Sequence, residues 1–178
     1  MSLTYPANFI LLSAMNPCPC GYSSDPRHEC TCNSMNIQKY MAKISGPLLD
    51  RIDLHIEVPA IHFEELAAKQ DGEPSRVIRK RVQTARDHQI QRFKHDLHIY
   101  SNADMPPKMI RSICKIDMDS AQLLKSAINN LGLSARAYDR ILKVSRTIAD
   151  LSGSDNIQTE HLSEAIQYRT LDRQLWMV

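Results

Sequence analysis

The hydrophobic pattern predicts two strands in the first third of the chain. Residues 8–14 form a short apolar run between Pro6 and Pro17, which is typical of a strand buried on both faces. Residues 52–58 alternate apolar and polar side chains throughout, as a strand with one buried face does. A short helix is predicted within residues 36–44. Two strands joined by a long excursion with a helix favour a parallel pair inside an α/β sheet.

Beyond Pro59 the pattern predicts helices only. Capping residues such as Asp117 and Ser134 precede the helical segments, and Gly132 and Gly153 follow them. The predicted helices span residues 64–69, 75–93, 107–114, 119–130, 134–151 and 159–168. Apolar positions at helical spacing should face the core of a small bundle, and these are Ile141, Val144, Ile148 and Leu151.

The predicted fold is therefore mainly α with a partial α/β portion. Residues 1–60 are expected to be part of an α/β core with a cysteine-rich insertion, residues 61–104 a helical linker, and residues 105–178 a helical domain. Two strands cannot close a parallel sheet that is covered on both faces. We therefore expect the sequence to begin in the middle of a domain.

Composition and charge exclude some classes of protein. The chain has 178 residues, with 22 Lys and Arg against 20 Asp and Glu, so its net charge of +2 offers no basic field that would argue for nucleic acid. The longest apolar run, around residues 9–15, is far shorter than the roughly 20 residues that cross a bilayer. No secretion signal is present at the start. A cytoplasmic protein without a membrane partner is expected.

Four of the five cysteines cluster in a pattern that indicates a metal. In a chain without an export signal the thiols stay reduced, so a metal is favoured over disulfides. Four thiolates suit tetrahedral Zn²⁺ at a Zn–S distance of about 2.3 Å. The candidate ligands are Cys18, Cys20, Cys30 and Cys32. His28 could replace one sulfur, and reduced cysteines without a metal are the other interpretation. Cys114 stands alone and is expected to be a buried core thiol.

Four motifs occur in an order that resembles one family. They are A-M-N-P-C-P-C-G-Y at 14–22, D-P-R-H at 25–28, S-G-P-L-L-D-R-I-D-L at 45–54 and L-S-A-R-A-Y at 133–138. Together they resemble the magnesium-chelatase-like AAA+ ATPases of the ComM/YifB type, over nearly all of residues 5–173. The resemblance implies the C-terminal half of an AAA+ core followed by a helical lid. It also implies a parent that uses ATP and Mg²⁺, neighbouring subunits in a homo-oligomeric ring, and DNA remodelling or branch migration in the ComM branch.

The same resemblance implies roles for four polar residues. Asn16 matches sensor 1, whose amide orients the attacking water near the γ-phosphate. Arg51 matches the arginine finger, which reaches the nucleotide of the neighbouring subunit. Arg136 matches sensor 2 on the lid, and Arg140, one turn further on, is the second candidate for that role.

Each of these residues also has a plain structural interpretation. Asn16 could cap a strand before the turn at Pro17. Arg51 could pair with Asp50 or Asp53 on a solvated surface, and Arg136 could be an ordinary exposed arginine. The basic residues of the segment 75–94 fit either a DNA-facing surface or a solvated helix face.

Two motifs needed for phosphoryl transfer are absent from the sequence. It contains no G-x-x-x-x-G-K-[ST] loop and no apolar run that ends in a paired Asp-Glu for Mg²⁺. This polypeptide alone is therefore expected to be inactive as an ATPase. The alternative function is that of a zinc-stabilised binding module with no ATPase role.

Overall fold

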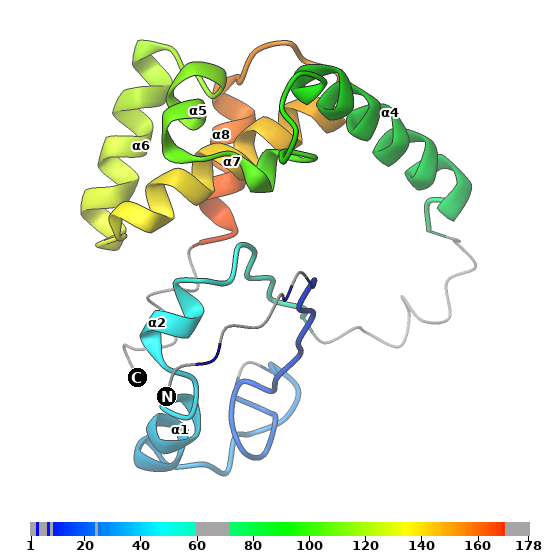
Figure 1. Cartoon of the computed structure of the whole chain (residues 1–178). Coiled ribbons are helices and arrows are strands. Elements are labelled where there is room, and N and C mark those ends of the chain that lie inside the picture. The colour runs from blue at the N-terminus through cyan, green and yellow to red at the C-terminus, as the bar shows by residue number, and fades with distance from the viewer. Residues whose placement is uncertain (1–2, 4–6, 8, 24, 60–71, 170–178) are drawn as a thin grey trace. The chain divides into compact units, whose positions relative to one another are not determined.

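The computed structural model describes residues 3, 7, 9–23, 25–59 and 72–169 (Figure 1). The chain divides into two compact units, Met1–Lys43 and Ile44–Val178. The helix predicted within residues 64–69 lies outside the described residues.

In its described residues the first unit has a long irregular loop and helix α1 (Ser34–Met41). The side chain of Asn33 caps this helix by accepting the backbone N–H of Asn36 at 2.8 Å. Ile37 and Met41 are buried on one face of α1 because they lie four residues apart. The predicted helix within residues 36–44 is thus confirmed, with a start two residues earlier.

The two predicted strands are wrong, since the structure has no strand in the residues that it describes. Residues 9–14 and 52–58 have no regular structure, and the side chains of Ile10 and Leu12 are 88% and 91% exposed. A strand needs a neighbouring strand for its backbone N–H and C=O groups, and a parallel strand needs a cover on both faces. Neither segment has such a neighbour in the described part of the chain. The α/β portion is therefore not seen, and the fold is helical.

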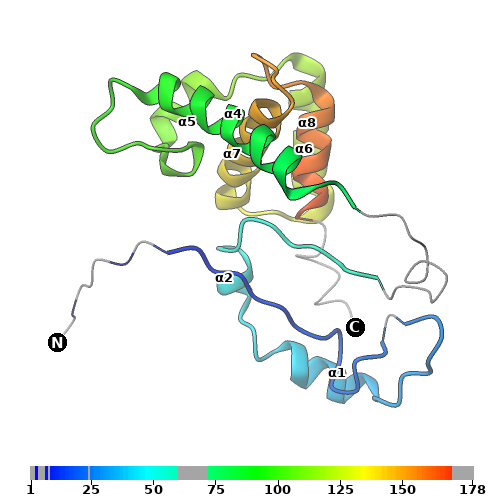
Figure 2. The same ribbon diagram turned by 90° about the vertical axis from the view of Figure 1, so that its right-hand side faces the viewer.

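The second unit is a helical bundle arranged around α7. Its elements are α2 (Gly46–Leu49), α4 (Ser75–Phe93), η1 (Asn102–Asp104), α5 (Pro107–Ile113), α6 (Met118–Leu131), α7 (Ala135–Leu151) and α8 (Thr159–Gln167). Helix α7 packs against α4, η1, α5 and α8, and α6 packs against α8. Figures 1 and 2 show α5 to α8 gathered in one bundle, while the N-terminal part of α4 extends beyond it.

The amphipathic pattern of α7 places three of the four predicted residues in the core, and Leu151 is not part of it. Ile141 is fully buried, and Val144 and Ile148 pack against the same core. Residues of α4, α5, α6 and α8 complete it, among them Phe93, Ile110, Leu124 and Leu162. Cys114 belongs to this core and is 4% exposed, which confirms the prediction of a buried thiol.

Side chains at the helix ends decide where the helices begin and stop. Asp117 accepts the backbone N–H of Ser120 at 2.8 Å, and Ser134 accepts that of Ala137 at 3.2 Å. Gly132 ends α6 with φ +58°, a left-handed conformation that glycine adopts without strain. Helix α8 begins at Thr159 as predicted, and Gln158 occupies its N-cap position.

A buried ionic network holds α4 against α7. Asp150 of α7 accepts two hydrogen bonds from the Arg92 guanidinium, at 2.7 and 2.5 Å. It also accepts one from Asn102 Nδ2 at 2.8 Å and one from Arg146 Nε at 3.1 Å. With 1% of its side chain exposed, the carboxylate is desolvated, and these donors compensate for that cost.

Candidate functional site

The four clustered cysteines converge in the first unit. The Sγ atoms of Cys18, Cys20, Cys30 and Cys32 all lie within 4.8 Å of one another. A tight turn brings the first pair together, because the backbone N–H of Gly21 donates to the carbonyl of Cys18 at 3.0 Å. Gly21 has φ +88°, a conformation that L side chains rarely adopt, and this explains the glycine at the end of the turn.

The sulfur geometry fits a tetrahedral ion. Cys18 Sγ lies 3.3 Å from Cys20 Sγ and 3.7 Å from Cys30 Sγ, and the latter two are 3.6 Å apart. A regular tetrahedron of thiolates around Zn²⁺ has an edge of about 3.8 Å when the Zn–S distance is about 2.3 Å. None of the four is in a disulfide. These residues can therefore hold a four-coordinate metal with no ligand position left open.

The surroundings of the clustered cysteines give their thiols different pKa values. The pKa of Cys20 falls to about 5, chiefly because the backbone N–H of Tyr22 donates to its sulfur and then because of a hydrogen bond with Cys18. The pKa of Cys30 rises to about 11: a bond from the Cys32 backbone opposes the shift, but desolvation and the neighbouring sulfurs outweigh it. The sulfur of Cys20 thus carries negative charge at neutral pH. A bound cation would favour ionisation of the other cysteines of the cluster.

His28 is not part of this metal-binding group. Its Nδ1 lies 3.1 Å from the carboxylate of Asp25, and its ring stacks on Tyr22 with ring centroids 4.8 Å apart. The pKa of Asp25 is lowered to about 2, first by a hydrogen bond from the Arg27 side chain. In the described residues the metal-binding group consists of the four cysteines alone, so the proposed exchange of a sulfur for His28 has no support in the geometry.

Asn16 lies next to the cysteine turn. Its side chain is exposed and has no hydrogen bond to any residue that the structure describes. A Cβ atom added at Gly21 would lie 3.7 Å from Asn16 Nδ2, so the amide lies close to the turn. The interpretation of Asn16 as a strand cap is wrong, because no strand ends there. Asn16 belongs to the first unit, and the three candidate arginines belong to the second.

Arg51 follows α2 and is exposed. Its guanidinium donates to the carbonyl of Pro47 at 2.8 Å. The alternative pairing with Asp50 or Asp53 does not occur, because other side chains occupy both carboxylates. Ser134 Oγ lies 2.9 and 3.0 Å from the two oxygens of Asp50, and Asp53 pairs with Arg140. The finger candidate therefore retains most of its donors for another ligand.

The segment around Arg51 is attached to both α7 and α8. Arg169, just after α8, donates to the carbonyl of Ile52 and lies 3.6 Å from the carboxylate of Asp50. The backbone N–H of His55 donates to the carbonyl of Tyr168 at 3.0 Å. The Arg169 side chain is 1% exposed. Sequence reasoning missed Arg169, since nothing in the local pattern distinguishes it from the solvated arginines of other helix ends.

The two lid candidates differ in their surroundings. Arg136 is exposed and has no hydrogen bond or ion pair with a described residue. Arg140 lies one turn further along α7 and is partly buried, and its pKa is lowered first by desolvation and then by the charge of Arg169. Arg51 adds a smaller repulsion of the same sign. The structure therefore brings Arg51, Arg140 and Arg169 into one cationic group with two aspartates.

Arg86 of α4 donates to the side-chain oxygen of Gln89 at 3.0 Å, and the other arginines and the lysine of this helix divide into two sets. Arg92 belongs to the buried network with Asp150, and Arg81 forms two hydrogen bonds of 3.0 Å with the carboxylate of Glu73. The other set is exposed and has no charged partner among the described residues. It consists of Arg76, Arg79 and Lys80.

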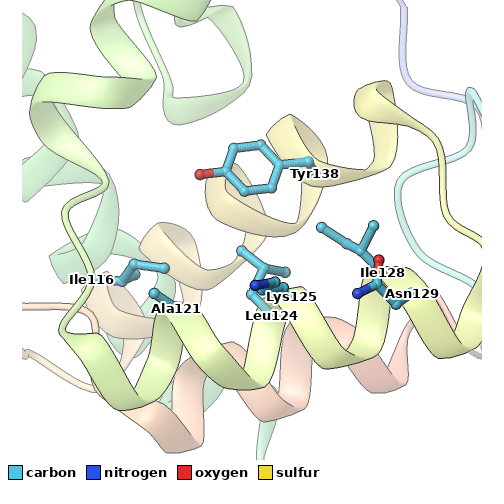
Figure 3. Close-up of a pocket in the computed structure, with 7 residues that line it drawn as sticks. All are labelled: Ile116, Ala121, Leu124, Lys125, Ile128, Asn129 and Tyr138. Carbon is cyan, nitrogen blue, oxygen red and sulfur yellow. The ribbon is translucent and has the colours of Figure 1, made fainter.

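A shallow groove of about 250 Å³ lies between α6 and α7. Tyr138 of α7 lies above it, and Leu124, Lys125 and Ile128 of α6 form its floor (Figure 3). Its lining is mostly apolar, and it contains none of the candidate residues. The groove therefore does not contribute to the site.

No helix in the described part of the chain has both the length and the apolar composition that a bilayer crossing requires. Two family models match the sequence: "Magnesium chelatase, subunit ChlI" over residues 1–66 and "Magnesium chelatase, subunit ChlI C-terminal" over residues 72–169. YifB of Escherichia coli strain K12 is 41% identical over 174 residues, and the competence protein ComM of Haemophilus influenzae is 42% identical over 174 residues. Each alignment covers 97% of this chain and 33% of the relative. The chain thus spans about a third of the length of these relatives.

Proposed function

The chain belongs to the magnesium chelatase subunit ChlI family, and from this premise we propose that it supplies the sensor and finger residues of an AAA+ ATPase ring. In this proposal the residues 105–178 act as the lid. Because the sequence has no phosphate-binding loop, the ATP phosphates and Mg²⁺ are held by parts of the whole protein outside these 178 residues. The ring is homo-oligomeric and works in the cytoplasm.

The observation that carries the proposal is the environment of Arg51. Its two neighbouring aspartates are engaged by Ser134, Arg140 and Arg169, so they do not neutralise it. A planar, permanently charged guanidinium with unused donors suits the charge that develops on a transferring phosphoryl group. Arg51 is therefore proposed as the arginine finger that acts on the neighbouring subunit.

The proposal gives the remaining candidate residues separate contacts with the nucleotide. Asn16, whose amide has no hydrogen bond with a described residue, would orient the attacking water. Arg136 of α7 would bind the phosphates from the lid side, since its guanidinium is exposed. Arg140 is the second candidate, and binding a phosphate would require it to leave Asp53.

The experiment is ATP turnover by the whole protein with Arg51→Ala. Loss of an arginine finger costs about 10³-fold or more in kcat, whereas the exposed Arg111→Ala on α5 should change nothing. Mixing Arg51→Ala subunits with Asn16→Ala subunits tests the action in trans. At mixed interfaces an intact Arg51 meets a site with an intact Asn16, so turnover should partly recover. Unchanged turnover with Arg51→Ala would refute the finger.

The cysteine cluster supports structural Zn²⁺ as a second part of the proposal. Its four sulfurs fit a closed tetrahedral site, and closed sites stabilise a fold rather than perform chemistry. The same cluster favours the alternative function, a zinc-stabilised binding module with no ATPase role. The two functions differ in one result, because only the ATPase loses turnover when Asn16 or Arg51 is replaced.

We further propose that DNA is the substrate that the ring remodels and that α4 faces it. The exposed cations Arg76, Arg79 and Lys80 lie within five residues in the N-terminal part of α4, and this part of the helix extends beyond the bundle (Figure 1). Cations without an acidic partner can replace the counterions of a phosphate backbone. A solvated helix face is the competing interpretation, and salt dependence distinguishes the two.

A further inference from the structure

We propose that the metal-binding turn of Cys18, Cys20 and Gly21 sets the position of the Asn16 side chain. The metal would then hold in place the amide that orients the attacking water, rather than stabilising only the loop. The inference rests on the role of Asn16 given above. Its tests are chosen so that the two can fail separately.

The covalent connection between Asn16 and the metal site is short and stiff. Only Pro17 separates Asn16 from Cys18, and its ring fixes one of the two backbone dihedrals of that residue. Cys18 is fully buried, and its carbonyl accepts the N–H of Gly21 at 3.0 Å. The backbone of Asn16 is therefore placed by the first metal ligand with little freedom.

The side chain of Asn16 lies close to the other end of the same turn. An added Cβ at Gly21 would lie 3.7 Å from Asn16 Nδ2 and 3.9 Å from its Cγ. No hydrogen bond to a described residue orients the amide. The turn at Gly21 is therefore the neighbour that limits where the amide can lie. A change in the turn should move the amide.

A bound metal would keep this turn closed. The Sγ atoms of Cys18, Cys20 and Cys30 lie 3.3 to 3.7 Å from one another, and that of Cys32 lies within 4.8 Å of them, a spacing that favours a shared cation. Ligand residues 18 and 32 delimit a loop of irregular backbone, which the ion would close. Without the ion, hydrogen bonds among the sulfurs and the neighbouring backbone would still join residues 18–21 to residues 30–32, but the coordinate bonds would be lost. Metal release should therefore shift the amide of Asn16.

Gly21→Ala separates positioning from simple loss of the metal. The added methyl group approaches Asn16 in a backbone conformation that strains an L side chain, but all four ligands remain. Gly72→Ala is the matched control, because a Cβ atom there meets no atom within 4 Å and the residue has no positive φ.

The first experiment observes the Asn16 side-chain amide by NMR in the zinc-loaded 178-residue chain. Asn16→Ala identifies its NH₂ signals, and Asn129 of α6 serves as a reference. Gly21→Ala with one zinc still bound should shift the Asn16 signals, as should chelation of the metal in the unaltered chain. Gly72→Ala should not. Asn16 signals that stay in place in zinc-loaded Gly21→Ala would overturn the inference.

The second experiment is a double-mutant cycle on ATP turnover by the whole protein, with zinc content measured for each variant. Gly21→Ala should lower kcat about tenfold through misplacement of the amide, with an unchanged KM for ATP. In an Asn16→Ala background it should cost nothing further. If Gly21→Ala lowered kcat by the same factor in the Asn16→Ala background as in the unaltered protein, the inference would be overturned. The role of Asn16 would then stand. If Asn16→Ala alone has no effect on kcat, the proposed function of Asn16 fails, and the inference fails with it.

Discussion

Asp53 forms an ion pair with Arg140 of α7, and this contact joins the segment that carries Arg51 to the helix that carries Arg136. Arg169 adds a second attachment through the carbonyl of Ile52. The finger candidate and the lid candidates therefore share one framework within the second unit. Under the proposed function, a movement of α7 would pass directly to the neighbourhood of Arg51.

The Asp53–Arg140 pair should contribute little to stability. The Asp53 side chain is 59% exposed, and pairs of this kind are worth about 1 kcal/mol or less because water screens them. We expect Arg140→Ala to lower the free energy of unfolding in urea by no more than that. A clear loss of ATP turnover in the whole protein with so small a loss of stability then reports a functional role of Arg140. A destabilisation of several kcal/mol would show that the residue is structural.

Metal binding should depend on the four clustered cysteines and not on Cys114. The purified chain should contain one zinc ion, and the double substitution Cys30→Ser with Cys32→Ser should abolish it because two thiolates hold Zn²⁺ weakly. Cys114→Ala should keep the metal, since Cys114 lies in the helical core of the second unit. Elemental analysis measures both. Retention of zinc by the double variant would exclude the proposed ligand set.

The lowered pKa of Cys20 predicts the order in which the thiols are alkylated after a chelator has removed the metal. With a pKa of about 5, Cys20 is ionised at neutral pH, and its reaction with iodoacetamide should slow only as the pH falls through about 5. Burial raises the pKa of Cys114 to about 11, so that thiol should stay unreactive until the chain unfolds. Peptide mass spectrometry identifies the modified residues. A Cys20 rate that rises steadily from pH 6 to pH 9 is incompatible with the lowered pKa.

Asp150 should be the most costly carboxylate to remove. Its loss leaves the Arg146 guanidinium, whose side chain is 3% exposed, without its charged partner. We expect Asp150→Ala to lower the free energy of unfolding by about 3–5 kcal/mol. The exposed Asp155→Ala is the control and should change it by less than about 0.5 kcal/mol. Urea unfolding of the two variants gives the comparison, and equal values would contradict the importance of the network.

Asp150 should also make the stability of the folded chain depend on pH. Burial opposes ionisation of Asp150, but hydrogen bonds from Arg92 and Asn102 outweigh it and lower the pKa below its ordinary value. Because the folded pKa is the lower one, the stabilisation is complete above the unfolded pKa of about 3.9 and is lost as the pH falls through the folded value. Asp150→Asn should flatten this part of the acid unfolding curve.

Salt dependence should reveal whether α4 binds DNA. Replacing Arg76, Arg79 and Lys80 by alanine should weaken binding of the whole protein to branched DNA and reduce the slope of log K against log salt by about 3. The matched control replaces Lys108, Arg111 and Lys115, which are exposed cations in and beside α5. If the two triple variants had equal slopes, or if the whole protein did not bind DNA at low salt, the cations of α4 would simply face solvent.

The local pattern of the chain sufficed for the helices in the described residues and for the grouping of the four cysteines. Apolar spacing in residues 134–151 and the caps Asp117 and Ser134 act over one or two turns, and the four cysteines lie within one loop. Such signals are readable because the groups that interact are close in the chain. Membership of the family likewise followed from short motifs in a defined order.

Contacts between distant segments could only come from the tertiary structure. The alternation in residues 52–58 satisfied the pattern of a strand, but a strand exists only when another one pairs with its backbone, and none does in the described part of the chain. Arg92, assigned to a basic surface by its neighbours, is half-buried and donates to the buried carboxylate of Asp150, 58 positions further on. The attachment of Asp50 and Asp53 to Ser134, Arg140 and Arg169 is equally invisible in the sequence. Pairing and burial depend on which segments meet in space, and local composition does not record that.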